Sequence, residues 1–216
     1  MAFKGRLNKK TALYFLFLCT FKTYPDILDD FHSSQQNFDE VQKLYISAID
    51  RGYLEAAEFL FVAGANPNAS PEFNNTILSH VLAQFYNTSE TEEDTLNRIL
   101  STLKLVLRHG SNPNTYIVDQ PPLYNSDGQM SVSPEKQTPL GMVIQYLRII
   151  PVTDLEREIC KEIAKALLEA GANPLSEEIL YGQKTTPLEM LKGFSVKHPD
   201  LLQKLEEAAN RLKSRN

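Results

Sequence analysis

The side chains best suited to metal or nucleophilic chemistry are few and scattered in this sequence. The chain has four histidines and two cysteines, namely His32, His80, His109, His198, Cys19 and Cys160. No two histidines have the spacing of metal ligands, and no cysteine lies near one, so we expect no metal site. His80 falls inside an expected helix, where a packing role explains it. His109 precedes Gly110, where a cation complements the end of a helix.

Three further patterns have simpler structural explanations than a catalytic one. His198-Pro199-Asp200 reproduces the HPD tripeptide of J-domain co-chaperones, yet no basic helix precedes it and the proline fits the first turn of a helix. The acidic run from Glu90 to Asp94 is typical of the solvated first turn of a long helix. The glycines form neither a phosphate loop nor a G-x-S-x-G elbow. We therefore expect no catalytic residue and no cofactor, and predict that the chain is not an enzyme.

Composition limits the classes of partner. The chain has 216 residues, of which 42% are hydrophobic and 23% charged, which is typical of a protein with a buried core. The net charge is −5, with 22 basic and 27 acidic residues. Nucleic-acid binding needs a dense cationic face, so we expect no nucleic-acid partner. Two isolated cysteines are too few for a disulfide scaffold, which favours a reducing compartment and a cytoplasmic location.

The N-terminal segment has two interpretations. Basic residues precede an apolar run at Thr11–Phe21, as in an export signal. The run is too short to span a bilayer, and no small-x-small cleavage site follows it. Its apolar residues also have helical spacing, which predicts a buried helix. We favour a helical cap over residues 1–36 and leave the export signal as the alternative.

Internal repetition in the sequence indicates which helices and turns position the candidate residues. Three segments align without gaps, Glu58–Ala69, Lys104–Tyr116 and Lys165–Ser176, and each contains Gly-[Ala/Ser]-Asn-Pro after an apolar helix. Glycine is expected to close the helix in the left-handed conformation, and proline prevents the helix from resuming. A second pattern, Thr-Pro-Leu at 138–140 and 186–188 with a weaker Thr-Ile-Leu at 76–78, predicts helices that begin at a threonine cap.

On these residues the chain resembles the ankyrin-repeat family. The segment Lys43–Ala69, KLYISAIDRGYLEAAEFLFVAGANPNA, follows the family pattern TPLHLAAxxGHLEIVKLLLxxGADVNA without a gap. Gly52 takes the glycine between the two helices, and Leu54 and Glu55 open the second helix. The resemblance implies an all-α fold, a helical solenoid of about four repeats with hairpin loops and no substantial sheet.

The repeats are expected to be longer than usual. Gly64, Gly110 and Gly171 are 46 and 61 residues apart, against about 33 residues in an ankyrin repeat. Apolar stripes at Leu96–Leu107 and Leu155–Leu167 predict that much of the excess lengthens the second helices of two repeats to four or five turns. Capping boxes are predicted at Ser89 with Glu92, at Thr153 with Glu156 and at Thr186 with Glu189. The proline-rich insertion 116–136 is expected to lack regular structure, and is either functional or disordered.

The expected organisation follows from these patterns. Residues 37–194 form the repeats, at about 37–69, 70–115, 116–175 and 176–198, and residues 199–216 form an amphipathic C-terminal capping helix. The histidine of the family's TPLH motif is replaced by Ile46, Ser79, Gly141 and Glu189, so we expect a less rigid array.

The resemblance implies a non-catalytic module that binds a protein partner. By position, the residues expected to face the partner are Asp50, Arg51, Glu72, Phe73, Asn75, Gln84, Glu135, Gln137, Gln145, Tyr146, Gln183, Lys184 and Phe194. The aromatic ones are expected to be exposed anchors. We expect a monomer. The alternative, by analogy with degenerate ankyrin chains that intracellular bacteria deliver into host cytoplasm, is an effector that acts on or inhibits a host enzyme through its inserted loops.

Overall fold

The computed structural model describes residues 38–69, 76–87, 93–119, 135–149, 153–194 and 198–215. Their elements are α3 (Phe38–Arg51), α4 (Leu54–Val62), α5 (Ile77–Asn87), α6 (Glu93–Arg108), β1 (Ile117–Asp119), β2 (Glu135–Gln137), α7 (Pro139–Ile149), α8 (Asp154–Glu169), β3 (Glu178–Leu180), β4 (Gln183–Thr185), α9 (Pro187–Lys192) and α10 (Pro199–Lys213). The described residues are mostly helical, as predicted. The small sheet was not predicted.

The chain divides into two compact units after Ala69. In the first unit, α3 and α4 pack against each other across a tight turn at Gly52, which has a φ of 69°. The buried side chains of this pair are apolar or aromatic, and Tyr45 and Leu60 are wholly inaccessible to solvent. The predicted helix pair and its glycine are confirmed here. The predicted N-terminal cap, 1–36, lies outside the described residues.

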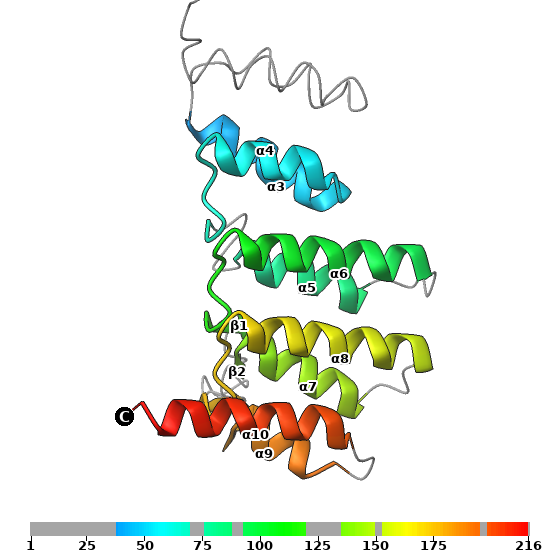
Figure 1. The fold of residues 1–216 in the computed structure, drawn as a ribbon, viewed down its shortest axis with the longest axis vertical. Coiled ribbons are helices and arrows are strands. Elements are labelled where there is room, and N and C mark those ends of the chain that lie inside the picture. Colours follow the sequence, from blue (N-terminus) through cyan, green and yellow to red (C-terminus); the bar gives the residue numbers. More distant parts are fainter. Residues whose placement is uncertain are drawn as a thin grey trace, which may run out of the picture. The chain divides into compact units, whose positions relative to one another are not determined.

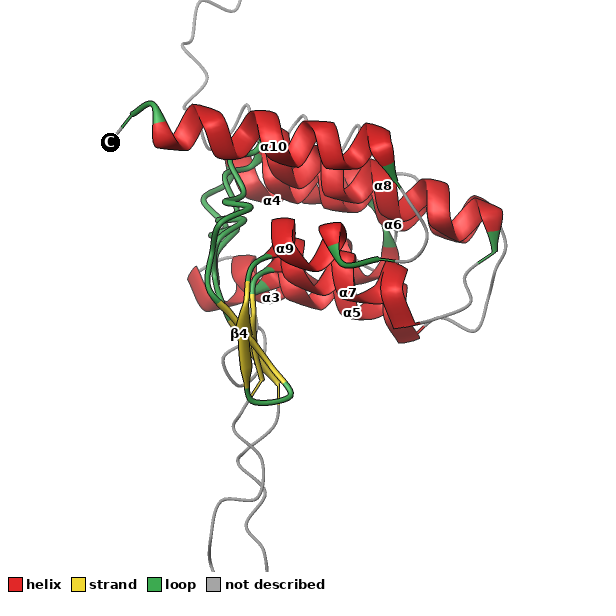
Figure 2. Ribbon diagram, turned by 90° about the horizontal axis from the view of Figure 1, so that it is seen from below, coloured by secondary structure: helices red, strands yellow, loops and turns green. Residues whose placement is uncertain are grey.

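The second unit contains three helix pairs arranged in two layers. The pairs are α5 with α6, α7 with α8, and α9 with α10. Contacts between successive pairs place α5, α7 and α9 in one layer and α6, α8 and α10 in the other, which Figures 1 and 2 show from two sides. Leucine, isoleucine and valine side chains from both layers fill the space between them, among them Leu103, Leu105 and Leu167.

The long second helices agree with the sequence interpretation. Helices α6 and α8 have 16 residues each, a little more than four turns. Thr153 caps α8 with the predicted reciprocal hydrogen bonds to Glu156, and Thr186 accepts a hydrogen bond from the Glu189 N–H at the start of α9. The predicted box at Ser89 and Glu92 lies outside the described residues.

The C-terminal helix α10 also begins and ends close to the prediction. Pro199 occupies its first turn, and Leu201, Leu205, Ala208 and Ala209 are buried, whereas the opposite side is charged and exposed. Helix α10 packs on α8 and α9. Its apolar stripe therefore covers α8 and α9.

A small antiparallel sheet joins the second unit at the starts of α7 and α9. Its strand order is β1-β2-β3-β4, and each strand has three residues. Figure 2 shows the sheet projecting from the layer of α5, α7 and α9. Strands β1 and β2 come from the two ends of the insertion 116–136, so the expectation that this segment lacks regular structure is wrong at its ends. Backbone pairing of Ile117 with Gln137 begins that hairpin despite the prolines between the strands.

Candidate protein-interaction surface

Three turns with the same hydrogen bonds close α4, α6 and α8. Gly64, Gly110 and Gly171 have φ values of 111°, 90° and 93°, as the sequence predicted. In every turn the glycine N–H donates to the carbonyl three residues earlier, and the next N–H donates to the carbonyl five residues earlier, at 2.9–3.2 Å. This is the Schellman pattern, which satisfies the last carbonyls of a helix. The chain therefore leaves each of these helices in the same direction.

The asparagine of each turn fixes the loop that follows. The side-chain oxygens of Asn66, Asn112 and Asn173 each accept a hydrogen bond from the backbone N–H two residues later, at 2.9–3.0 Å. In the second unit, Asn114 also joins neighbouring turns, because its Nδ2 donates to the Gly171 carbonyl at 3.0 Å and its Oδ1 accepts from the Asn173 N–H at 2.7 Å. These bonds hold the loops of successive helix pairs together beside the sheet.

The β3–β4 hairpin turns through two residues with positive φ, Tyr181 at 50° and Gly182 at 73°. Turns of this type match the twist of the two strands and favour Asn-Gly. Glycine adopts the conformation without strain, whereas a side chain at this φ costs about 1–2 kcal/mol. Tyr181 is nevertheless there, and 68% of its surface is exposed. A strained, exposed aromatic residue at a hairpin tip is more often kept for function than for folding.

A short polar chain holds this tyrosine. Gln137 of β2 donates from Nε2 to Oε1 of Gln145 on α7 at 2.5 Å, and Gln145 Nε2 donates to the Tyr181 hydroxyl at 3.4 Å. The second bond is long and contributes little energy, but it positions the hydroxyl over α7. The ring itself stays exposed. We call Tyr181, Gln145 and the β4 residues Gln183 and Lys184 the hairpin surface.

The predicted contact residues lie in several environments. Asp50 and Arg51 are exposed at the end of α3, and Gln183 and Lys184 are exposed on β4, where Lys184 pairs with Glu177 at 3.0 Å. Gln84, Gln145 and Tyr146 are half-buried on α5 and α7. Glu135 pairs with Asp119 across the β1–β2 hairpin, and its side chain is not described. The remaining predicted residues outside the described ranges are Glu72, Phe73 and Asn75.

Two predicted contact residues are buried, so their expected exposure is wrong. Phe194 is 6% exposed, and its ring packs edge-on against His198, with centroids 6.3 Å apart, where the chain passes from α9 to α10. Gln137 is 5% exposed because its amide is bonded to Gln145. Phe194 therefore packs inside the last helix pair. Gln137 can affect partner binding only by positioning Gln145 through their hydrogen bond.

Tyr146 is half-buried instead of being a free anchor. Its ring lies 5.2 Å from the Phe85 ring and 4.9 Å from the Tyr86 ring, measured between centroids. These contacts join α5 to α7. The hydroxyl of Tyr86 is buried here and has no hydrogen-bond partner among the described residues. Replacing Tyr146 is therefore expected to lower stability, contrary to the expectation of an exposed position.

The sequence interpretation missed Glu178, a buried acid in β3 that is fully inaccessible to solvent. Its carboxylate accepts hydrogen bonds from the Thr138 N–H at 2.8 Å and from the Thr138 hydroxyl at 2.6 Å. Burial raises the pKa of this carboxyl to about 7, although the Thr138 bonds and the charge of Lys136 oppose the rise. The carboxylate thus ties the second hairpin to the start of α7.

Glycine at position 141 makes room for this carboxylate. A Cβ at Gly141 would lie 2.6 Å from the Glu178 carboxyl carbon. Gly141 stands where the ankyrin pattern has histidine. The missing side chain was the only sign in the sequence that another group could occupy this space. Sequence alone did not indicate that an acid 37 positions later fills the space.

The described residues offer little for catalysis. Cys160 is buried, and burial followed by the charge of Glu156 raises the pKa of its thiol to about 12, which disfavours the nucleophilic thiolate. No group of three or more His, Cys, Asp or Glu residues that could hold a metal ion occurs in the part of the chain that the structure describes. Within the same ranges, no helix combines the length and apolarity needed to cross a membrane.

No protein-family model matches the sequence, and no curated protein is significantly similar to it.

Proposed function

We propose that this chain is a non-catalytic protein-binding module built from stretched ankyrin-type repeats. Support for the repeat type comes from the three identical helix-closing turns and from the ungapped pattern at Lys43–Ala69. Two successive helix pairs in the second unit, α5 with α6 and α7 with α8, are joined turn to turn by Asn114. Modules of this type bind proteins with the surface beside their hairpins.

The observation that carries the proposal is Tyr181. Its exposed ring stands on a strained turn, and its hydroxyl lies 3.4 Å from the Gln145 amide nitrogen, so the ring projects from the hairpin where a partner can cover it. Tyrosine is among the residues that dominate binding energy at protein interfaces. Lys184 and Gln183 beside it supply the polar rim that such an anchor needs.

The test separates binding from folding at this one position. Tyr181→Asn removes the ring but leaves a residue that tolerates positive φ, so folding should be slightly more stable than in the wild type. A partner captured by the intact chain and purified should bind this variant more weakly by about 2 kcal/mol, or about thirtyfold, in calorimetric titration.

Val62→Ala is the matched control, because Val62 is also large, apolar and 64% exposed but lies on α4. This variant should bind as the wild type does. Equal affinities of Tyr181→Asn and wild type would refute the hairpin surface as the binding site. The proposed function would be refuted if the immobilised chain captured no protein that an excess of free wild-type chain can displace.

A further inference from the structure

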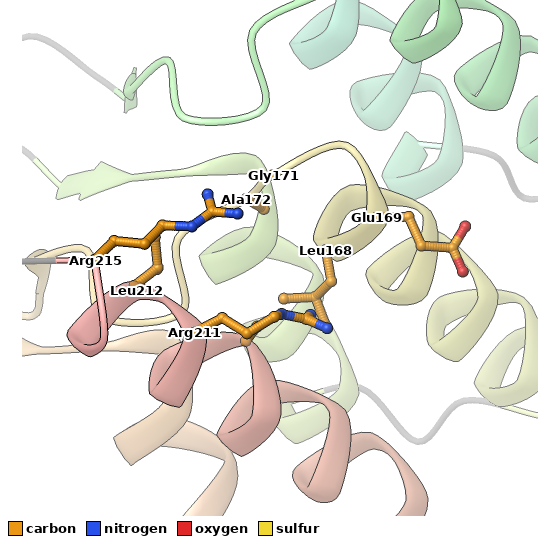
Figure 3. A pocket seen from close by; sticks show the side chains of 8 residues that line it. Leu168, Glu169, Gly171, Ala172, Arg211, Leu212 and Arg215 are labelled. Atoms are coloured by element: carbon orange, nitrogen blue, oxygen red, sulfur yellow. The ribbon is translucent and has the colours of Figure 1, made fainter.

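A pocket of about 380 Å³ lies between the end of α8 and the last turns of α10 (Figure 3). Its apolar lining comes from Leu168, Ala172, Ala208 and Leu212, and its charged lining from Arg211, Arg215 and Glu169. The volume is near the lower limit for ligand pockets, about 300–1,000 Å³, and has room for one or two side chains. The pocket is separate from the hairpin surface.

The two arginines at this pocket form no ion pair with any residue that the structure describes. Among the residues that the structure describes, no carboxylate pairs with either guanidinium group, and no hydrogen bond to either group is formed. Figure 3 shows both side chains reaching from α10 toward the α8 end, with Glu169 turned away from them. Two charged groups are thus held beside apolar surface with their donors unused.

Capping of α8 does not explain these arginines. The Leu167 and Leu168 carbonyls accept from the N–H groups of Ala172 and Gly171, and the Gly171 carbonyl accepts from Asn114. These three carbonyl groups therefore already have donors, and neither guanidinium group is needed to satisfy them. The arginines still benefit from the negative end of the helix.

The charge around the pocket is opposite to that of the whole chain. The net charge is −5, yet Arg211 and Lys213 lie in the last turn of α10 and Arg215 follows two residues later, so basic residues outnumber Glu169, the one acid in the lining. A single guanidinium group can bind a carboxylate through two parallel hydrogen bonds, and clusters of arginine are a common means of recognising acidic motifs. The apolar lining requires an aliphatic neighbour beside that acid.

We propose that this pocket is a second contact site that takes an acidic segment of the protein partner, with a carboxylate at Arg211 and Arg215 and an adjacent leucine-like side chain on the apolar lining. The inference rests on the proposed function, because it assumes that the occupant belongs to a protein. It adds a charge requirement on the partner that the hairpin surface does not impose.

The experiment uses the full ¹⁵N-labelled chain and the peptide acetyl-Leu-Glu-Leu-Glu-amide. Saturable shifts are expected in the Arg211 and Arg215 Nε–H signals and in the Leu168 and Ala172 amide signals, with a Kd below about 1 mM. Arg211→Gln and Arg215→Gln should each weaken binding about tenfold, since each removes a charge-assisted hydrogen bond. Both residues are exposed, so unchanged melting curves are expected for the variants.

Two controls make the result specific. Lys213→Gln removes the same charge from the same end of α10 but does not line the pocket, and should leave the peptide affinity within about twofold. The peptide acetyl-Leu-Gln-Leu-Gln-amide should produce no saturable shifts. Equal weakening by Lys213→Gln, equal binding of the glutamine peptide, or absence of binding at about 5 mM would each overturn the inference.

The two proposals fail in different ways. Partner binding that depends on Tyr181 but is indifferent to both arginine variants overturns the acidic site and leaves the proposed function intact. Saturable binding of the acidic peptide, without any effect of Tyr181→Asn on a captured partner, supports the pocket and refutes the hairpin surface.

Discussion

Gly141 and Glu178 depend on each other, although they belong to different elements. The carboxylate needs the space that glycine leaves, and the Thr138 N–H and hydroxyl at the start of α7 use the carboxylate as their acceptor. A buried donor without an acceptor costs about 1–3 kcal/mol, so removing either partner should lower the free energy of unfolding. This contact lies between the second hairpin and α7, the two elements that carry the hairpin surface.

A double-mutant cycle tests that dependence. Gly141→Ala should destabilise the protein by about 2 kcal/mol, because the new methyl group displaces a carboxylate that is held by two hydrogen bonds. In a Glu178→Ala background the same change should be neutral or stabilise by up to about 1 kcal/mol, since alanine favours a helix over glycine. Urea unfolding of the four proteins measures the coupling. Equal effects of Gly141→Ala in both backgrounds would contradict the contact.

The raised pKa of Glu178 predicts a pH dependence of stability. The carboxyl titrates at about 7 in the folded protein and near its usual 4.5 when unfolded. Between these values the folded state binds the extra proton, so the free energy of unfolding should fall as pH rises, by roughly 3 kcal/mol in total. The contribution is fully present below about pH 4.5 and is lost above about pH 7.

Glu178→Gln is the matched variant for this prediction. Its amide oxygen can accept from the Thr138 N–H and its NH2 group can donate to the Thr138 hydroxyl oxygen, but the amide cannot ionise. The difference in unfolding free energy between variant and wild type should therefore grow from pH 4.5 to 7 in favour of the variant. Unfolding in urea at several pH values gives that difference. A difference independent of pH would show that Glu178 does not titrate in this range.

At the level of elements, the three glycine turns set the direction in which the chain leaves each helix. Gly171 offers a clean test, because a Cβ there would meet no atom within 4 Å and only backbone strain is added. Gly171→Ala should cost about 1 kcal/mol, and Gly171→Asn less, since asparagine tolerates positive φ. Thermal unfolding followed by circular dichroism ranks the three proteins. Equal stability of the alanine variant and wild type would contradict the left-handed conformation.

The helices could be predicted because their determinants are local. Gly64, Gly110 and Gly171 mark helix ends, and Thr153 and Pro199 mark helix starts, whatever the rest of the chain does. The strands could not be predicted in this way. They have three residues each and depend on pairing between hairpins, such as Lys136 with Ile179, that are far apart in the sequence.

The candidate site was predicted only in part, for the same reason. Position in a repeat pattern identified the exposed residues of β4 and the half-buried Gln145, because these follow from register. It failed at Phe194, which is buried and packs its ring against His198. Tyr181 was missed because nothing in the sequence shows that a tyrosine takes the strained first place of a Tyr-Gly turn.

In the second unit as a whole, α8 is the central helix of its layer. It contacts α6 on one side and α10 on the other, and Leu167 is wholly buried there. Packing of this kind links neighbouring helix pairs and makes their unfolding cooperative.

Leu167→Ala should therefore lower the free energy of unfolding by about 2–5 kcal/mol through the cavity that it leaves. Amide hydrogen exchange with mass spectrometry should show faster exchange in peptides from α6 and α10 as well as from α8. Glu158→Ala is the control, because Glu158 lies on the same helix and its side chain is 64% exposed. Faster exchange confined to α8 would contradict the cooperative packing.

The contact between Gly141 and Glu178 also restricts the order in which these positions can change during evolution. A lineage that first replaces Glu178 with a smaller residue gains the freedom to fill position 141, whereas one that first replaces Gly141 meets the buried carboxylate. Paths between this pair and a histidine at position 141 should therefore run through loss of the acid. Among descendants of this chain, a larger residue at 141 is expected only where residue 178 has already lost its carboxylate.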